Sequence, residues 1–230
     1  MSGSGDDERH EIKFATYAAN LPAVQRWLRL REEGFVTPYP PRHVNNLYFD
    51  TWNYRAYADN LAGVSQRAKV RLRWYGESPL PEAAALEIKR KRNHFGWKLR
   101  YPVATADWDA DLPWAELQRR IRAQLPPDGR LWFDHSPQPV LLNRYRREYF
   151  VTADGRIRAT IDTGQQAFDQ RYALRPNLRS PAIMQDTLVL ELKFARADRQ
   201  LAVALLASVP LRVGRHSKFM NGMRAAGFAG

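Results

Sequence analysis

Basic side chains recur at every second position of short segments in which apolar residues fill the positions between. Several of these segments also contain a glutamate or an aspartate. The segments are Arg9-Glu11-Lys13, Lys69-Arg71-Arg73, Glu87-Lys89-Lys91, Tyr145-Arg147-Tyr149, Arg158-Thr160-Asp162 and Glu191-Lys193. Because successive side chains of a β-strand point to opposite faces, each segment predicts a strand with one charged face and one apolar face. Like charges on neighbouring strands repel, so such a surface indicates an anionic partner.

The charged face has two interpretations. An antiparallel sheet commonly exposes one polar face to solvent, and any single segment fits that description. The recurrence of Lys and Arg in segments spread over the whole chain favours a second interpretation, in which the sheet closes and the cations line its bore. Repulsion between the cations is stronger in a confined space of lower dielectric constant. A polyphosphate chain would relieve it, because the planar guanidinium group can make two hydrogen bonds to phosphate oxygens.

Three glutamates share the charged face: Glu11, Glu87 and Glu191. Each could form ion pairs with the cations or bind a metal, since Mg²⁺ or Mn²⁺ at a phosphoryl-transfer site needs only one or two carboxylates besides phosphate oxygens and water. We favour a metal at Glu191 and leave both roles open for Glu11 and Glu87. Asp50 and Asp162 are expected to orient cations.

The composition of the chain limits which partners and which cellular compartment are consistent with the sequence. The 230 residues carry 36 Lys+Arg against 24 Asp+Glu, a net charge of +12, which indicates a nucleic acid, an anionic lipid or a small polyanion as partner. The chain has no cysteine, which excludes disulfides and Cys-based zinc sites and fits a reducing compartment. No apolar run approaches the roughly 20 residues of a membrane-spanning helix. We expect a cytoplasmic protein, which could reach a membrane only through a membrane-protein partner.

The elements that must position these residues are mostly strands. Strand patterns cover 9–14, 44–50, 67–75, 84–92, 96–103, 140–151, 156–163 and 187–194, and helix patterns cover 20–33, 53–62, 113–125, 199–208 and 217–227. Pro126-Pro127 is expected to end the third helix in a loop. The resulting fold class is α+β, mainly antiparallel β: an eight-stranded closed barrel with helices packed outside. Residues 1–8 are expected to be a flexible tail, and 9–230 a single domain.

The same segments resemble, in order, a known family: the polyphosphate polymerase domain of the vacuolar transporter chaperone (VTC) family, within the triphosphate tunnel metalloenzyme or CYTH-like superfamily. The matching stretches are RHEIKF at 9–14, NNLYFDT at 45–51, KVRLRWYG at 69–76, LEIKRK at 86–91, YRREYF at 145–150, RATID at 158–162, LVLELKF at 188–194 and RHSKF at 215–219. The resemblance implies an eight-stranded antiparallel tunnel, a nucleoside triphosphate as phosphate donor, and Mn²⁺ or Mg²⁺ as cofactor.

The resemblance also implies roles for individual residues. Those expected to act in catalysis by holding phosphates are Lys13, Arg71, Arg73, Lys89, Arg147, Arg158 and Lys218. Those expected to bind substrate are Glu11, Lys69, Lys91, Tyr145, Lys193, Arg215 and Ser217. Glu191 is expected to hold the metal.

The expected function is that of a polymerase, which transfers the terminal phosphoryl group of ATP or another nucleoside triphosphate to a growing inorganic polyphosphate chain. The alternatives are a triphosphatase of inorganic triphosphate or nucleoside triphosphates and a non-catalytic module that binds polyphosphate. Besides the nucleotide, the expected ligands are inorganic polyphosphate, triphosphate or pyrophosphate. Arg9 stands where the hydrolytic branch of the superfamily has the first glutamate of its Glu-x-Glu-x-Lys pattern, and this argues against a two-metal triphosphatase. Nucleic acid is not the expected partner, because aromatic residues such as Trp74 and Phe194 alternate with the charges and so face the other side.

Overall fold

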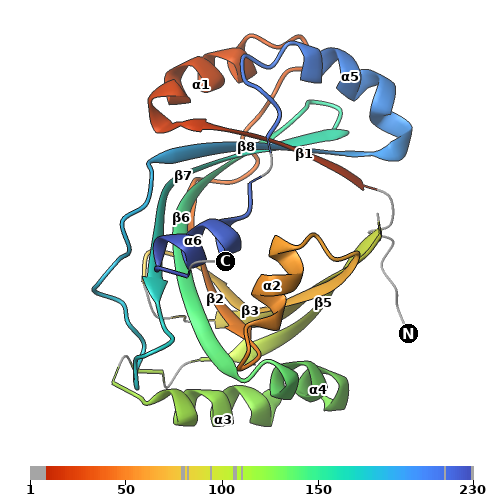
Figure 1. Cartoon of the computed structure of the whole chain (residues 1–230). Helices are drawn as coiled ribbons and strands as arrows, with labels where there is room; N and C mark the ends of the chain where they lie inside the picture. The colour runs from red at the N-terminus through yellow and green to blue at the C-terminus, as the bar shows by residue number, and fades with distance from the viewer. Residues whose placement is uncertain are drawn as a thin grey trace. The chain divides into compact units, whose positions relative to one another are not determined.

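Eight strands form one antiparallel sheet in the computed structural model (Figure 1). The structure describes residues 9–78, 81, 83–93, 95–105, 108, 109, 111–214 and 216–228, so the expected tail at 1–8 lies outside it. The strands are β1 (Arg9–Tyr17), β2 (Arg42–Asp50), β3 (Gln66–Tyr75), β4 (Ala83–Arg92), β5 (Phe95–Ala104), β6 (Gln138–Val151), β7 (Ile157–Asp169) and β8 (Thr187–Ala195). All eight predicted strands are confirmed.

The strands follow the order β1-β8-β7-β6-β2-β3-β4-β5. This order has two ends, β1 and β5, so the hydrogen-bonded ladder formed by the described residues is open. The antiparallel sheet is therefore confirmed, and its closure into a barrel stays a prediction.

The helices are α1 (Leu21–Arg29), α2 (Arg55–Leu61), α3 (Trp114–Gln124), α4 (Pro127–His135), α5 (Arg199–Ala207) and α6 (Lys218–Ala225), with short 3₁₀ turns at Ala18–Asn20 and Arg196–Asp198. Each of the five predicted helices is present, with shorter ends. The loop expected after Pro126-Pro127 is wrong, because α4 begins there. Proline is well accommodated in the first turn of a helix, where its missing N–H would have no intrahelical partner. The same pair of prolines therefore ends one helix and starts the next.

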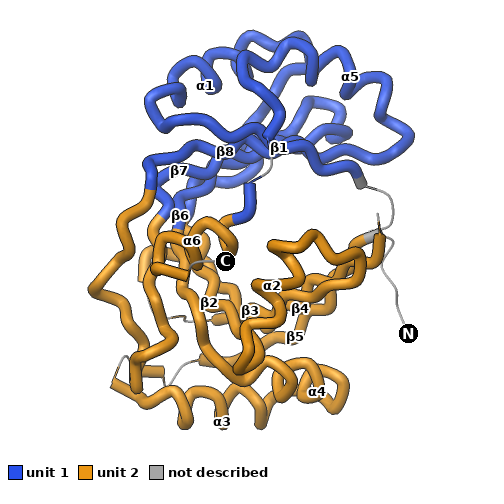
Figure 2. The backbone as a smooth tube through the Cα atoms, in the orientation of Figure 1, with its two compact units in different colours: residues 1–42, 145–165, 185–217 blue, residues 43–144, 166–184, 218–230 orange. Residues whose placement is uncertain are grey.

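The chain divides into two compact units (Figure 2). Unit 1 comprises 1–42, 145–165 and 185–217, and unit 2 comprises 43–144, 166–184 and 218–230. Each unit has its own hydrophobic core. The expectation of a single domain over 9–230 stays a prediction.

The core of unit 1 lies between its helices and the apolar face of its strands. Helix α1 contributes Val24, Trp27 and Leu28, whose spacing places them on one side of the helix. The strands contribute apolar residues that alternate with the charged ones: Phe14, Ile157, Ala159, Ile161, Leu188, Leu190, Leu192 and Phe194. Burial of this face fixes the direction of the opposite face, so the charges of β1, β7 and β8 point away from the core.

Unit 2 contains two cores, on opposite faces of its strands. Helices α3 and α4 cover one face, where residues such as Leu72, Leu86 and Ile121 are fully buried. Helices α2 and α6 pack near the other face, around Tyr48 and Phe219. Helix α6 approaches β6 so closely that a Cβ atom on Gly222 would lie 2.6 Å from a methyl group of Leu141. A larger residue at position 222 would therefore force the Leu141 side chain to shift.

None of the helices in the described part of the chain is both long enough and apolar enough to cross a membrane.

Candidate functional site

The charged face of unit 2 is carried by β3, β4 and β5, and we call it the cationic face. Strand register places Lys69 opposite Lys89, and Lys89 opposite Lys98, so three ammonium groups occupy one row across the strands. In the next row, Glu87 lies between Arg71 and Arg100. The basic residues of this face are Arg67, Lys69, Arg71, Arg73, Lys89, Lys91, Lys98 and Arg100. They outnumber the carboxylate of Glu87, so the face is strongly positive.

Glu87 is the buried anchor of this face. Its Oε2 accepts hydrogen bonds from Nε and Nη2 of Arg71 at 3.0 and 2.7 Å, and its Oε1 lies 3.3 Å from Nζ of Lys98. Nη1 of Arg73 lies 3.6 Å from Oε2. Burial alone would raise the pKa of Glu87, but the neighbouring cations lower it to about 2. The ion pairs of Glu87 account for its buried position, and among the described residues no group of three or more His, Cys, Asp or Glu side chains could hold a metal.

Neutral residues of β2 and β6 complete the support of the arginines. Nε of Arg73 donates to Oδ1 of Asn46 at 2.7 Å, and Nδ2 of Asn46 donates to Oδ1 of Asn143 at 2.8 Å. Nη1 of Arg71 donates to the hydroxyl of Tyr48 at 3.4 Å. Burial would raise the pKa of Tyr48, but Arg71 and Arg73 bring it below its ordinary value. Both guanidinium groups are thus held in place by buried side chains.

The first turn of helix α6 brings another of the predicted cations, Lys218, close to the cationic face. Lys218, the first residue of α6, lowers the pKa of Tyr48 through its charge. Nζ of Lys69 lies 5.3 Å from the ring centroid of Phe219, the next residue of α6. Lys218 and Lys69 therefore belong to the surroundings of the cationic face.

In unit 1, four charged side chains of β1 and β8 form a closed ring of ion pairs, which we call the ion-pair ring. Register places Lys13 opposite Glu191 and Glu11 opposite Lys193. Nζ of Lys13 lies 2.6 Å from Oε1 of Glu11 and 3.5 Å from Oε2 of Glu191. Nζ of Lys193 lies 2.5 Å from Oε1 of Glu191 and 3.5 Å from Oε2 of Glu11. Each carboxylate therefore contacts both ammonium groups.

The ring lowers the pKa of its buried carboxylate. Burial would raise the pKa of Glu191, but Lys193 and Lys13, with a smaller effect from Arg147, hold it well below its usual range. The pKa of Lys13 is raised, because attraction to Glu11 and Glu191 outweighs the effect of burial. The ring thus joins two ammonium groups to two carboxylates.

Arg147 of β6 lies in unit 1 with a rigid orientation. Its Nε and Nη2 donate to the two carboxylate oxygens of Asp162 at 2.6 and 2.7 Å, and Asp162 is fully buried. The guanidinium carbon lies 5.3 Å from the ring centroid of Tyr145, which is also buried. The expectation that Asp162 orients a cation is therefore confirmed.

The corresponding expectation for Asp50 is wrong. Its carboxylate accepts backbone N–H groups of Thr51, Ala56 and Tyr57 at 2.7, 2.8 and 3.0 Å. Asp50 therefore stabilises the turn between β2 and α2 and the first turn of that helix.

The remaining predicted residues occupy three different situations. Arg158 is exposed on β7, directly opposite Lys193, and no carboxylate pairs with it within the described ranges. Ser217 is half-buried in the segment just before α6, beside His216, whose Nε2 lies 3.0 Å from Oε1 of Gln165. Arg215 lies outside the described residues.

Lys98 and Arg100 were missed by the sequence interpretation, although a signal for them was present. They occupy alternate positions of the predicted strand 96–103, the same pattern that identified the other cations. Asn46 and Asn143 were missed as well, and no periodic charge could have indicated them, because they act through buried amide groups.

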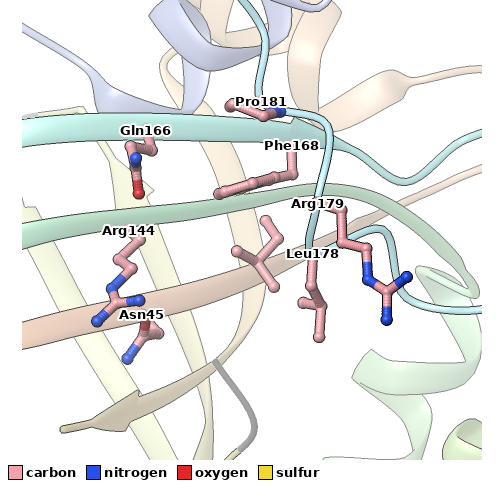
Figure 3. A pocket seen from close by; sticks show the side chains of 8 residues that line it. Asn45, Arg144, Gln166, Phe168, Leu178, Arg179 and Pro181 are labelled. Carbon is pink, nitrogen blue, oxygen red and sulfur yellow. The ribbon is translucent and has the colours of Figure 1, made fainter. Parts of the chain in front are cut away.

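A separate pocket lies in unit 2, beside β2, β6 and β7 (Figure 3). Its volume is about 260 Å³, and its walls include Asn45, Arg144 and Phe168. Arg144 is already occupied there, because its Nη2 donates to the backbone oxygen of Glu77 at 2.7 Å and lies 3.2 Å from the carboxylate. The pocket is thus distinct from the cationic face and less positive.

Solved structures of similar fold were compared with the chain. A candidate adenylate cyclase from Vibrio parahaemolyticus has a TM-score of 0.51 and 12% identity, over 92% of this chain and 95% of that one. A candidate adenylyl cyclase from Hippeastrum, with a dominant triphosphatase activity, has a TM-score of 0.49 and 14% identity, over 96% of each chain. A protein from Pyrococcus horikoshii has a TM-score of 0.43 and 12% identity, over 92% and 97%. The first likeness shows a shared fold and nothing more.

Comparison of the sequence with models of protein families identifies the family. No curated protein matches the chain. The family model of the VTC domain matches residues 8–226, which is nearly the whole length. This range includes every strand and helix described above, together with the cationic face and the ion-pair ring. The chain belongs to the VTC domain family.

Proposed function

We propose that this VTC domain is a metal-dependent polyphosphate polymerase, which transfers the terminal phosphoryl group of ATP to a growing inorganic polyphosphate chain. The observation that carries the proposal is the cationic face, where lysines lie opposite lysines on neighbouring strands. Directly opposed like charges destabilise a sheet, and a bound polyanion offsets that cost. Membership of the VTC family supports a phosphorylated substrate.

The arginines of both units would supply most of the catalytic effect. Phosphoryl transfer needs in-line positioning and neutralisation of the charge on the moving group, and little covalent help from the protein. Arg71 and Arg73 are fixed by Glu87 and Asn46, and Arg147 is fixed by Asp162. Donors that are held in place before the substrate binds need no reorganisation during the reaction, and this increases their effect on the rate.

The proposed reaction requires no general base. The attacking group is the terminal oxygen of the polyphosphate chain, which is anionic at neutral pH, and the products are ADP and a chain longer by one phosphate. The carboxylates in the two clusters are poorly suited to take a proton, since the pKa values of Glu87 and Glu191 lie far below neutrality. This matches a reaction in which no proton must leave the nucleophile.

A divalent metal fits the ion-pair ring only together with phosphate. Glu11 and Glu191 provide two carboxylates that are linked by the same two lysines, and the described residues contain no group of three or more acidic or imidazole side chains that could hold a metal alone. Mg²⁺ or Mn²⁺ bound through one or two carboxylates completes its coordination with phosphate oxygens and water. When bound there, the metal would neutralise charge on phosphate oxygens.

The proposal includes the closed barrel expected from the resemblance. Closure requires hydrogen bonds from β1 and β5 that the open order of the sheet does not contain. We expect the outward-facing backbone N–H groups of both end strands to be protected from hydrogen exchange in solution. Rapid exchange along both edges would contradict closure without affecting the assignment of phosphate-binding residues.

The activity is tested by incubating the purified protein with ATP and Mn²⁺ and resolving the products on a gel. Long polyphosphate is the expected product. Orthophosphate without chain growth would support a triphosphatase, and tight binding of polyphosphate without turnover would support a non-catalytic module. The same assay with other nucleoside triphosphates identifies the donor.

A pair of variants tests the site assignment. We expect Arg73→Gln to abolish synthesis, since it removes a guanidinium group of the cationic face. Arg92→Gln is the matched control, because Arg92 is exposed at the end of β4 and alternation places it on the opposite face from Lys89 and Lys91. Equal activity of the two variants would refute the assignment.

A further inference from the structure

The ion-pair ring occupies the carboxylates of Glu11 and Glu191, which the proposed function assigns to the metal. Lys13 and Lys193 each contact Glu11 and Glu191, at distances between 2.5 and 3.5 Å. The two Glu-x-Lys sequences of β1 and β8 produce this arrangement, because antiparallel register sets the glutamate of one strand opposite the lysine of the other. A metal ion that approached the ring from water would have to displace an ammonium group.

The surroundings of the ring add to this barrier. Arg158 lies directly opposite Lys193 on β7, and the charge of Arg147 reaches Glu191. The ring joins two ammonium groups to two carboxylates, and Arg147 is paired with Asp162, so Arg158 leaves the region with a positive excess. A divalent cation is therefore repelled by its surroundings as well as excluded from its ligands.

A bound phosphate group would remove both obstacles to metal binding, namely the occupied carboxylates and the surrounding positive charge. The lysine side chains are partly exposed, with 27% of Lys13 and 37% of Lys193 accessible, while 7% of Glu191 is accessible. Their ammonium groups can therefore turn to a phosphate oxygen while the buried carboxylate stays in place. That movement would free carboxylate oxygens at the moment when the positive excess is neutralised.

From this geometry we infer that Lys13 and Lys193 compete with the divalent metal for Glu11 and Glu191, so that the site takes a metal only when a polyphosphate or triphosphate group draws the lysines away. The inference rests on the proposed function for the identity of the phosphate ligand and extends it by making metal and phosphate binding interdependent. Each ligand then raises the affinity for the other by the same factor, as thermodynamic linkage requires.

The test measures Mn²⁺ binding by electron paramagnetic resonance in the absence of any phosphate. Wild-type protein should bind Mn²⁺ weakly. Lys193→Met, which keeps much of the side-chain length and removes the charge, should bind Mn²⁺ at least about tenfold more tightly, within the usual range of coupling between sites. The control is Arg199→Met, which removes one positive charge from an exposed position at the start of α5. Lys13→Met should reproduce the gain if Lys193→Met folds poorly.

Three results decide the outcome. Equal Mn²⁺ affinity of Lys193→Met and wild type, or an equal gain in Arg199→Met, would overturn the inference. A gain that persists in the double variant Glu191→Gln/Lys193→Met would also overturn it, because the metal would then be bound elsewhere. The measurement involves neither ATP nor turnover. A protein that makes no polyphosphate but gains Mn²⁺ affinity in Lys193→Met would refute the proposed function and keep the competition.

A second measurement examines the interdependence directly. Water-proton relaxation detects Mn²⁺ bound in a ternary complex with protein and tripolyphosphate. Wild-type protein should show this enhancement, and Glu191→Gln should lose it. A wild-type protein without enhancement would contradict the interdependence.

Discussion

At the scale of single residues, two of the arginines proposed to bind phosphate are held by buried carboxylates. Arg147 makes two hydrogen bonds to Asp162, and Arg71 makes two to Glu87. Such pairs leave part of each guanidinium group for a ligand and restrict its rotation. The number and direction of the N–H groups then matter as much as the charge.

Replacement of Arg147 by lysine tests this distinction. Arg147→Lys keeps the positive charge beside Asp162, so we expect the fold to persist, but it loses the planar fork that binds Asp162 and a phosphate together. The rate of polyphosphate synthesis should fall by about tenfold or more, which corresponds to the loss of one hydrogen bond to a charged group. Arg146→Lys is the control, since Arg146 pairs with Glu148. Full activity of Arg147→Lys would show that charge alone is sufficient.

The low pKa of Glu87 predicts a specific dependence of stability on pH. Folding lowers this pKa from 4.5 to about 2, so the ionised group stabilises the folded protein above pH 4.5 and the contribution is lost as the pH falls toward 2. The total effect is of the order of 3 kcal/mol. The difference in unfolding free energy between wild type and Glu87→Gln, measured with urea, should therefore shrink between pH 5 and pH 2. The exposed Glu32→Gln should show no such trend; a similar trend there would contradict the assignment to Glu87.

At the scale of elements, alternation along the strands decides which residues can meet the substrate. Strand β5 supplies Lys98 and Arg100 to the same rows as Lys89 and Glu87. The cationic face therefore extends one strand further than the matching stretches of the family resemblance indicate. Variants of the β5 cations therefore test whether all three strands of the cationic face bind the substrate.

We expect Lys98→Gln and Arg100→Gln each to weaken the binding of tripolyphosphate, measured by calorimetry, by about fivefold to tenfold, as the loss of one contact to a charged group implies. Lys98 also contacts Glu87, so its variant should have the larger effect if the carboxylate helps to orient Arg71. Arg92→Gln provides the control on the opposite face. Unchanged affinity in both β5 variants would confine the binding surface to β3 and β4.

At the scale of the whole molecule, the two compact units are interleaved along the chain. Each unit is assembled from three separate segments, and strands β6 and β7 run through the boundary between them. A strand that carries core residues of both units transmits the unfolding of one to the other. The chain should therefore unfold as one cooperative body.

Calorimetry tests this expectation. The calorimetric and van't Hoff enthalpies of unfolding should agree, as they do for a two-state transition. A variant with a cavity in the unit 1 core, such as Leu190→Ala, should lower the single transition by several degrees. Two resolved transitions, with only one of them shifted by Leu190→Ala, would show that the units are independent domains.

Most of the fold could be predicted from the sequence, because charged and apolar residues alternate with the period of a strand over most of the eight segments. Burial of the apolar side leaves only one direction for the cations. The strand faces that carry Lys13, Arg71 and Lys193 could therefore be predicted as well. Helix α4 could not be predicted in this way, since Pro127 is compatible with a loop and with a first helical turn. The helix is favoured over a loop by the packing of Phe133 in the hydrophobic core of unit 2.

The sequence by itself determined which residues are charged and which face of each strand they share. Tertiary structure alone decided which charges meet, because partners are set by register between strands distant in sequence. Register joined Glu11 and Glu191 to the same two lysines and surrounded Glu87 with cations. Asp162 binds Arg147 of another strand, whereas Asp50 binds backbone amides within the next seven residues, although both occur in similar short sequences. The pairs Glu11–Lys13 and Glu191–Lys193 lie two residues apart on one strand. The pairs between strands are contacts in space, and no local pattern records them.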